Sequence, residues 1–336
     1  MSYWSVLIPE ATTNDISNPS FEVGATTGWT AFGTDTLAVS TTYQYYGRYS
    51  GKLTSASEYV FVDEFDGVSD FNCIKFASAN GAESVATGTA YTLSVMLYGD
   101  ATIVGKTARI RLNEVGGAVD EAILGGTATK SATVVAGWQS LTTAVGTITQ
   151  ADRTSIRAVL GIDSAEISDV SYWDGAQVEK KAYGTTYCDG DQAGCSWNGT
   201  ALASTSTRTS QSRSGGRWKD LYDDYGFGVI SMIGFGMPEL RHNTTPYSIL
   251  PGSYLQSIKT KERQFALIME SQGGSLTSLH TKRDYLIDAF KPDLVYPLQP
   301  VKLKYSGATT ELVISAHYLE GLEGMFDGEE GVNERI

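Results

Sequence analysis

The chain of 336 residues is predicted to be mainly β, with a β-sandwich in its first half and a sheet or sandwich carrying one α-helix in its second. Short alternating apolar runs, such as 91–98, 108–112 and 157–162, recur in the first half between clusters of Gly, Asp, Asn and Ser. This pattern is typical of an all-β sandwich. Only the stretch 275–290 has clear helical spacing. The 36 glycines suit a protein with many turns.

These patterns divide the chain into three segments. Residues 1–182 form the first predicted module, 183–219 a connector rich in Gly, Asp, Ser and Thr, and 220–336 the second module. The length is sufficient for two domains that each bury a core. The run 203–216 has no apolar pattern, so a flexible or extended linker is expected there.

The first module opens with Asn-Pro-Ser-Phe-Glu at 18–22 and closes with Val170–Glu179. Between them lie Gly28-Trp29, Gly-Arg-Tyr-Ser-Gly-Lys-Leu at 47–53 and Gly-Trp-Gln at 137–139. Together these motifs resemble carbohydrate-binding modules with the galactose-binding-like jelly roll. The resemblance implies an N-terminal jelly-roll β-sandwich and, as an expectation, a carbohydrate ligand.

The resemblance also implies a structural calcium ion beside the first and last strands. Glu22 and Asp174 stand at the matching positions, and the backbone of Asn18 would add a further oxygen. Calcium prefers several hard oxygen ligands, which two carboxylates and carbonyl groups supply. The alternative is that both acids are solvated turn residues. No other cofactor is expected.

Sugars bind by stacking their apolar faces on aromatic rings, with polar groups around them. The candidate sugar-binding residues are Trp29, Tyr43, Tyr45, Tyr46 and Trp138. The alternative for Trp29 and Trp138 is packing in the core or at its rim. Neighbouring residues on a strand point to opposite faces, so at least one ring of the cluster 43–46 is expected to be exposed.

The predicted connector holds two of the three cysteines. Cys188 and Cys195 lie six residues apart across a Gly/Asp turn and are able to form a disulfide in an oxidising medium. Cys73 lies in an apolar β pattern and is expected to be a small buried hydrophobic residue. The stretch 187–200 resembles a segment that follows such modules in phage tail proteins. The connector also carries the main basic cluster, expected to be solvated: Arg208, Arg213, Arg217 and Lys219.

The second module combines strands with one amphipathic helix. Strands are predicted at 228–234, 253–260, 263–270, 301–305 and 311–318. Ser275 is a candidate helix cap, Leu279 and Leu286 lie on the apolar face, and Pro292 ends the helix. Such a helix is expected to pack on a sheet.

This order resembles the N-terminal belt domain of siphophage distal tail proteins. The matching residues are Gly-Met-Pro-Glu at 236–239, Gly-Ser-Tyr-Leu at 252–255, Arg263 and Phe265, and the helix with its following Pro292. The resemblance implies a homo-oligomeric, hexameric ring that joins tail tube and tail tip proteins. Here the sugar-module-like segment precedes the belt, whereas the family often carries it afterwards. A further strand is expected beyond Gly324; a strand supplied by a neighbour or partner and a divergent ending are the alternatives.

Composition and motifs exclude other classes. A net charge of −13 argues against nucleic acid, and neither a signal peptide nor a membrane-inserted segment is recognised. His242, His280 and His317 stand in no catalytic motif, so an enzyme is not expected. An acidic cluster is interpreted as a solvated loop, with a calcium loop or a catalytic pair as alternatives: Asp63, Glu64, Asp66 and Asp70.

The leading hypothesis is therefore a structural phage tail-tip protein of the virion, assembled in the host cytoplasm. Its ring would lie at the baseplate, and its jelly roll would bind cell-surface glycan for host adhesion. One alternative is a carbohydrate-binding lectin or glycosidase accessory module without a ring role. Another is a tail-associated hydrolase.

Overall fold

The computed structural model forms two compact units. The sandwich unit is Pro9–Arg217, and the terminal unit combines Met1–Ile8 with Trp218–Ile336. The described residues are 3–56, 72–76, 85–116, 119–210, 215–234, 240–246, 251, 253–260, 263–272, 276–290, 300–307, 310–318, 325–326 and 333–335. Several predicted features lie outside them: the acidic cluster at 63–70, Arg213, the motif at 236–239, Ser275 and Pro292.

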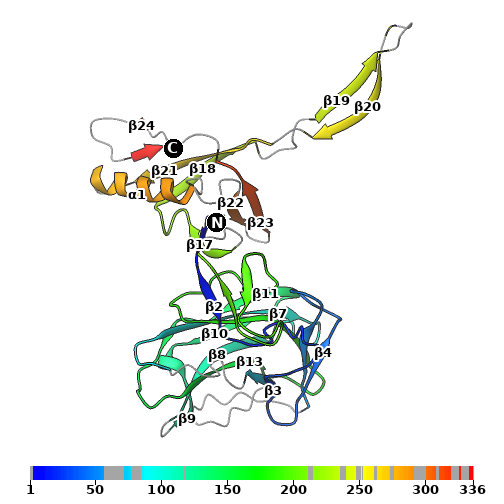
Figure 1. The fold of residues 1–336 in the computed structure, drawn as a ribbon, viewed down its shortest axis with the longest axis vertical. Helices are drawn as coiled ribbons and strands as arrows, with labels where there is room; N and C mark the ends of the chain where they lie inside the picture. Colours follow the sequence, from blue (N-terminus) through cyan, green and yellow to red (C-terminus); the bar gives the residue numbers. More distant parts are fainter. Residues whose placement is uncertain are drawn as a thin grey trace. The chain divides into compact units, whose positions relative to one another are not determined.

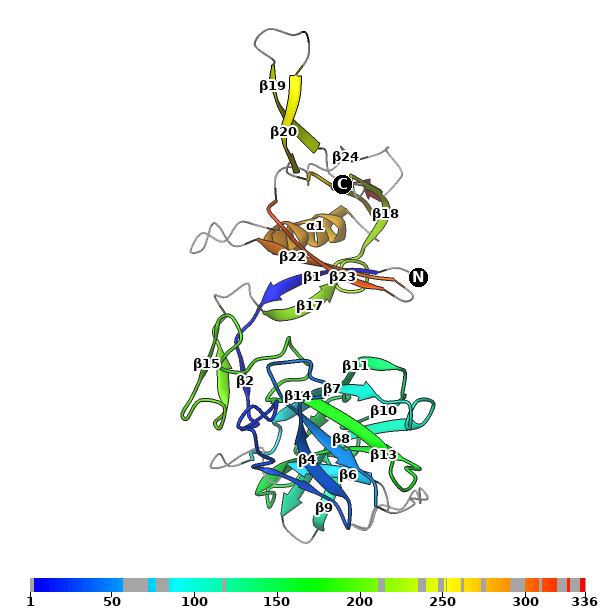
Figure 2. The ribbon, with the colours of Figure 1, turned by 90° about the vertical axis from the view of Figure 1, so that its right-hand side faces the viewer.

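Two antiparallel sheets build the sandwich unit (Figures 1 and 2). One has the order β10-β8-β13-β6-β3 with β9 beside β8, and the other β11-β7-β14-β5-β4 with β12 beside β7. The strand bounds are β3 Trp29–Ala31, β4 Thr36–Ser40, β5 Ser50–Thr54, β6 Asn72–Phe76, β7 Ala90–Gly99, β8 Thr107–Gly116, β9 Val119–Ile123, β10 Thr129–Thr133, β11 Gly137–Thr142, β12 Gly146–Thr147, β13 Ser155–Asp163 and β14 Val170–Glu179. A 3-10 turn, Leu124–Gly126, follows β9. The mainly β class predicted from the sequence is confirmed.

The core of this unit lies between the two sheets. Leu97 of β7, Ile110 of β8, Leu160 of β13 and Trp173 of β14 belong to one buried cluster. Along β7 the residues Leu93, Val95 and Leu97 are buried, while the alternating Ser94, Met96 and Tyr98 are only half-buried. This alternation is the period of a strand with one face on the core. The opposite face of the β7 sheet is therefore left for other contacts.

The predicted linker is part of the sandwich unit, which corrects the expected boundaries. Residues up to Arg217 belong to this unit. Strands β15 (Cys195–Trp197) and β16 (Ser206–Arg208) pair with each other, and β16 pairs with β2 (Thr12–Asn14). The segment lacks an apolar pattern because polar contacts hold much of it in place, as the geometry below shows.

The terminal unit takes its first strand from the beginning of the chain. Its sheet has the order β17-β1-β22-β23, and Trp4 of β1 lies opposite Tyr305 of β22. The strands are β1 Tyr3–Pro9, β17 Gly216–Asp220, β22 Val301–Ser306 and β23 Glu311–Ala316. The predicted module 1–182 therefore wrongly included the first eight residues. Local sequence does not reveal a strand partner that lies near the other end of the chain.

Further strands complete this unit. A second sheet has the order β18-β21-β25-β24, with β18 Phe227–Ile233, β21 Ala266–Gln272, β24 Met325–Phe326 and β25 Asn333–Arg335. The chain itself thus supplies the strands β24 and β25 beyond Gly324, where a further strand was expected. Among the described strands, β19 (Leu240–Pro246) and β20 (Ser253–Thr260) pair only with each other.

The predicted helix is α1, Leu276–Phe290. Leu279 and Leu286 are fully buried, whereas Tyr285 is 61% exposed. Leu286 joins a cluster with residues of β1, β18, β21 and β22: Trp4, Val6, Phe227, Met269, Val301 and Leu303. The helix therefore packs on the sheets of its own unit, as expected. Within the described part of the chain, none of the helices is long and apolar enough to cross a membrane.

Candidate functional site

A row of aromatic side chains crosses the outer face of the β7 sheet. Trp138 of β11 lies opposite Tyr98 of β7, and Tyr98 lies opposite Tyr172 of β14. Directly opposite residues of antiparallel strands share one face of the sheet. The ring centroids are 5.4 Å apart for Tyr98 and Trp138 and 6.1 Å apart for Tyr98 and Tyr172. Lys52 of β5 lies opposite Tyr172 and extends the row.

The loop between β4 and β5 adds further rings to this row. Tyr43 stacks on Tyr98 with 3.8 Å between centroids and 16° between planes. Tyr43 and Tyr172 form an edge-to-face pair with 5.0 Å between ring centroids. Tyr45 is 49% exposed and lies edge-on to Trp138 at 5.5 Å. We call these five residues the aromatic face: Tyr43, Tyr45, Tyr98, Trp138 and Tyr172.

Tyr46 is half-buried beside the exposed Tyr45. Its ring stacks on Tyr187 at 4.1 Å and meets Tyr45 edge-on at 4.8 Å. Burial, with the charge of nearby Asp174 adding, raises the pKa of Tyr46. Tyr46 and Tyr187 therefore form an inner layer that supports Tyr45 rather than part of the exposed surface.

Trp29 does not belong to the aromatic face. It is 3% exposed and packs in the core against Phe21 at 5.4 Å and Phe76 at 5.1 Å. Its Nε1 donates a hydrogen bond of 3.1 Å to the carbonyl oxygen of Asn18. Trp29 is thus a core residue, so its candidacy as a sugar platform is wrong. Trp138, by contrast, is half-buried at the edge of the face.

Polar groups lie beside the rings. A hydrogen bond with Tyr43 raises the pKa of Tyr98, with the charge of Asp100 adding to the effect. Burial, followed by the Asp100 charge, raises the pKa of Tyr172. The Asp100 carboxylate therefore lies near the tyrosines of the face. Phenol hydroxyls both donate and accept hydrogen bonds, whereas a carboxylate only accepts them. These side chains are therefore able to form hydrogen bonds with a ligand rich in hydroxyl groups.

Two carboxylates hold the backbone of the aromatic loop. Asp174 Oδ2 accepts hydrogen bonds from the N–H groups of Tyr45 at 2.7 Å and Tyr46 at 2.9 Å. Glu22 Oε1 accepts from the N–H groups of Arg48 at 2.8 Å and Tyr49 at 2.7 Å. These charge-assisted bonds fix the segment 45–49. The predicted calcium ligands Glu22 and Asp174 therefore position the rings, whether or not a metal is bound.

A glycine is required inside this loop. Gly47 has φ of +71°, in the left-handed region that side chains other than glycine disfavour. A Cβ atom at this position would lie 2.4 Å from Cδ of Glu22. The glycine lets the loop backbone approach the Glu22 carboxylate closely enough for its N–H groups to donate.

The environment of Asp174 fits a cation. This residue is fully buried, and its Oδ1 has no hydrogen-bond partner among the described residues. Burial raises the pKa of Asp174 to about 7, with the Glu22 charge adding and the backbone N–H groups opposing. A hard cation would use the vacant lone pairs of Oδ1 and relieve the repulsion between the carboxylates.

Asn18 has a clear role in the turn before β3. Its side-chain Nδ2 donates to the carbonyl oxygens of Ala25 at 3.0 Å and Thr27 at 3.1 Å. Its φ is +53°. The part that Asn18 plays toward a metal stays a prediction. Among the described residues, no three or more His, Cys, Asp or Glu side chains gather in a metal-binding arrangement.

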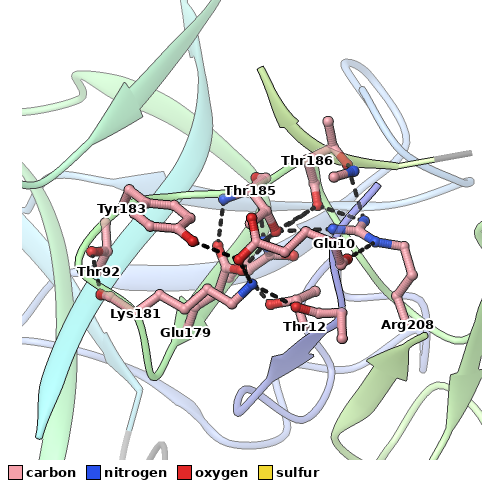
Figure 3. A network of polar contacts seen from close by, with 12 residues as sticks. Glu10, Thr12, Thr92, Glu179, Lys181, Tyr183, Thr185, Thr186 and Arg208 are labelled. Atoms are coloured by element: carbon pink, nitrogen blue, oxygen red, sulfur yellow. Dashed lines mark hydrogen bonds and ion pairs between the residues drawn. The ribbon is translucent and has the colours of Figure 1, made fainter. Parts of the chain in front are cut away.

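The segment that follows β14 is held by a buried polar network (Figure 3). Arg208 is 2% exposed and donates from Nε to Glu10 O at 3.2 Å and from Nη1 to Thr186 O at 2.9 Å. Its Nη2 donates to Thr185 Oγ1 at 3.0 Å. Glu179 accepts from Thr185 N at 2.7 Å, from Thr185 Oγ1 at 2.6 Å and from the Thr12 hydroxyl. Arg208 is therefore an internal anchor.

The other predicted basic residues also make specific contacts. The Arg217 guanidinium lies 4.0 Å over the ring of Tyr183, and the hydroxyl of Tyr183 donates to Glu10 at 2.6 Å. Lys219 lies 5.7 Å from the ring centroid of Tyr225 in the terminal unit. The expected solvated basic cluster is therefore wrong for Arg208. Arg208, Arg217 and Lys219 contact different residues, and Arg213 lies outside the described residues.

Sequence reasoning found part of the aromatic face and missed Tyr98, Tyr172, Tyr187 and Asp100. A signal for Tyr98 existed, because it is the outward member of an alternating strand. Tyr172 precedes the buried Trp173 on the closing strand, so the two must face opposite sides. The pairing of these strands with Trp138 was not visible locally.

Comparison with known proteins gives similarity to carbohydrate-binding modules over about half of the chain. No protein-family model matches the chain, and no curated protein does. The C-terminal family 22 module of Clostridium thermocellum Xyn10B is 18% identical with a TM-score of 0.36, covering 51% of this chain and 93% of the module. The CBM22-1 xylan-binding domain of Paenibacillus barcinonensis Xyn10C is 20% identical with a TM-score of 0.33, covering 52% and 99%. TmCBM61, solved with β-1,4-galactotriose, is 13% identical with a TM-score of 0.32, covering 50% and 99%. Scores this low carry no conclusion about ligand, and the distal-tail resemblance stays a prediction.

Proposed function

We propose that the sandwich unit binds carbohydrate at the aromatic face. The observation that carries this proposal is the row of Trp138, Tyr98 and Tyr172 on the outer face of one sheet. Tyr172 is itself only 5% exposed beside Tyr43, so the half-buried Trp138 and the exposed Tyr45 offer the accessible ring surface. A sugar ring offers an apolar C–H surface for contact with aromatic rings and hydroxyl groups for hydrogen bonds at its rim. The tyrosine hydroxyls and Asp100 supply those bonds.

The binding role is proposed without catalysis. Glu22 and Asp174 are committed to backbone N–H groups of the aromatic loop. Hydrolysis of a glycosidic bond generally uses two carboxylates that flank the scissile bond. Asp100 is the carboxylate whose charge raises the pKa of Tyr98 and of Tyr172, after the larger effects of a hydrogen bond and of burial. Turnover of a polysaccharide that is lost on Asp100→Asn would support the hydrolase alternative instead.

A glycan array probed with the full chain tests the proposal, followed by calorimetry with the best-bound glycan. Trp138→Ala and Tyr45→Ala are each expected to weaken binding about tenfold or more, roughly 1.4 kcal/mol. Tyr285→Ala is the matched control, because this tyrosine is 61% exposed on α1 of the terminal unit. Equal affinity of all three variants, or an array without a bound glycan, would overturn the proposal.

We also propose that Glu22 and Asp174 hold a structural calcium ion. The unpartnered Oδ1 of buried Asp174 and the nearby Glu22 charge support this assignment. The ion would neutralise both carboxylates while their other oxygens keep the loop N–H groups. It would strengthen the support of the aromatic loop and take no part in chemistry.

A second proposed function is self-association of the terminal unit, as the distal-tail resemblance implies. Strand β18 lies at the edge of its described sheet and exposes Ile230, Met232 and Ile233 at 53%, 45% and 57%. Edge strand β23 exposes Leu312 and Val313 at 49% and 51%. Unprotected apolar edges favour pairing with another chain.

The β19–β20 hairpin also supports self-association. It is a two-stranded sheet among the described strands, and an isolated hairpin of this kind is marginally stable in water. Contact with another copy would stabilise it. In this proposal the copies form a ring, hexameric in the resembling family, between tail tube and tail tip proteins of a virion. The sandwich unit would then present the aromatic face for host adhesion.

Light scattering coupled to gel filtration tests the association. A discrete oligomer that becomes smaller on Met232→Lys supports it, with Tyr222→Lys as a control at a residue that is 65% exposed on a turn. A monomer at the highest concentration, together with tail particles that lack a ring of this chain by electron microscopy, would refute it. If the chain then still bound glycan, the lectin or accessory-module alternative would be the remaining function.

A further inference from the structure

Two thiols lie in the segment of the sandwich unit that follows β14. Cys188 is fully buried, Cys195 is half-buried, and both are free cysteines. The two side chains are joined by a hydrogen bond. Cys195 begins β15, where it lies opposite Arg208 of β16. The fold therefore brings the sulfur atoms together without a covalent link.

The loop between the two cysteines is already closed by its own contacts. Asp189 Oδ1 accepts from the N–H groups of Asp191 at 2.9 Å and Gln192 at 3.0 Å. Cys195 N donates to Gln192 O at 2.9 Å. A Cβ atom on Gly190 would lie 2.0 Å from the Trp197 ring, so this glycine lets the tryptophan cover the loop. The chain between the two cysteines is therefore a compact turn.

Both ends of the loop are anchored to the sandwich. Cys188 N donates to Gln177 Oε1 at 2.6 Å, and Cys188 O accepts from Ser206 Oγ at 2.9 Å. Asn14 Nδ2 donates to the same carbonyl at 3.2 Å. The backbone at Cys188 therefore stays fixed while its thiol faces Cys195.

The two thiols differ in reactivity. The hydrogen bond from Cys188, assisted by the charge of Arg208, lowers the pKa of Cys195. The same hydrogen bond and burial raise the pKa of Cys188. The thiolate is the nucleophilic form, and a depressed pKa with partial exposure marks the reactive member of a pair. Cys195 is also the thiol that an oxidant can reach, since Cys188 is fully buried, so Cys195 is the attacking thiol and Cys188 the resolving one.

We infer that Cys188 and Cys195 form an intramolecular disulfide when the protein meets a low-molecular-weight disulfide such as oxidised glutathione. The Cys195 thiolate attacks one sulfur of the oxidant, forms a mixed disulfide and releases one glutathione thiolate. Cys188 then gives up its proton and attacks Cys195 sulfur, which releases the second glutathione. Two protein thiols lose two electrons, and one oxidant disulfide becomes two thiols.

The disulfide would lock the segment that supports the inner ring layer. Tyr187, which immediately precedes Cys188, stacks on Tyr46 at 4.1 Å. A crosslink restricts the unfolded chain and so raises stability. This inference is independent of glycan binding, since neither sulfur atom belongs to the aromatic face.

The test is oxidation of the full chain with oxidised glutathione, followed by alkylation under denaturing conditions and tryptic mass spectrometry. Both cysteines fall in the single peptide 182–208, whereas Cys73 falls in the peptide 53–75. The expected result is a peptide 182–208 that has lost two hydrogen atoms and resists alkylation, while Cys73 stays alkylated. A stable glutathione adduct on Cys195, or two alkylated cysteines in 182–208, would overturn the inference.

Thermal unfolding gives a second readout that needs no glycan. The oxidised wild type is expected to melt at a higher temperature than the reduced form, and dithiothreitol should reverse the shift. Cys188→Ser and Cys195→Ser should each melt at one temperature under both conditions. If either variant showed the wild-type shift, another group would be responsible and the assignment would fail.

Discussion

The sandwich unit and the terminal unit expose apolar side chains in different ways. The exposed apolar surface of the aromatic face consists of rings, and its loop is fixed by the carboxylates of Glu22 and Asp174. In the terminal unit the edge strands β18 and β23 expose aliphatic side chains, among them Ile230 and Leu312. Fixed rings suit a small rigid ligand that offers C–H surfaces and hydroxyls. Aliphatic edges with available backbone groups suit another polypeptide. This difference is the reason for proposing two separate binding surfaces.

The largest expected effect concerns the segment that follows β14 within the sandwich unit. Arg208→Ala removes the buried donors that serve Glu10 O, Thr186 O and Thr185 Oγ1. Leaving buried polar groups without partners is expected to lower the free energy of unfolding of the sandwich unit by about 2–4 kcal/mol. Urea denaturation of the full chain measures it. The control is Arg217→Ala, whose cation–π contact with Tyr183 is worth about 1 kcal/mol. An unchanged midpoint for Arg208→Ala would restore the flexible-linker interpretation.

The second prediction concerns stabilisation by the proposed calcium ion. Calcium at about 100 times its dissociation constant should raise the free energy of unfolding by roughly 2.7 kcal/mol. Asp174→Asn should abolish this gain, because the amide removes the charge while keeping an oxygen toward the loop N–H groups. Differential scanning calorimetry with calcium, magnesium and a chelator measures the response. A calcium response that persists in Asp174→Asn would place the ion elsewhere.

The strands and the helix could be predicted because their signals are local. Alternation along β7 and helical spacing along α1 are properties of one segment, and both elements appear where they were expected. The strand β1 could not be placed, because its partner β22 lies near the other end of the chain.

The candidate site could be predicted only in part. Tyr43, Tyr45, Tyr46 and Trp138 were chosen by residue type, and all four gather in one place. Trp29 was chosen by the same rule and lies in the core, because residue type does not reveal which side of the sheet a ring occupies. Tyr98 and Tyr172 enter the site through strand pairing, which is a tertiary property. The burial of Arg208 likewise depends on acceptors contributed by distant segments.

The third prediction tests whether the loop must be fixed for glycan binding. Asp174 is fully buried and contacts the backbone of Tyr45 and Tyr46, so it would not touch a ligand. Asp174→Ala in the presence of a chelator is expected to weaken glycan binding about tenfold, roughly 1.4 kcal/mol. Asp174→Asn in the same buffer retains an acceptor and should recover most of the affinity. Calorimetry measures the glycan affinity of each variant. Equal affinity of Asp174→Ala and wild type would show that glycan binding does not depend on the hydrogen bonds of Asp174 to the loop.

The smallest expected effect on stability belongs to the terminal unit. Ile230 is 53% exposed on edge strand β18, so Ile230→Ser should change the free energy of unfolding of a separated subunit by no more than about 0.5 kcal/mol. If copies of the chain cover this strand, the same change should weaken their association, because the buried methyl groups would be lost from the interface. Sedimentation velocity over a concentration series separates the two quantities. Ile167→Ser is the matched control, since Ile167 is 61% exposed and belongs to the sandwich unit, not to strand β18. Weaker association by Ile230→Ser alone would assign assembly to the aliphatic edge, whereas equal behaviour of both variants would leave the aromatic face as the molecule's single proposed binding surface.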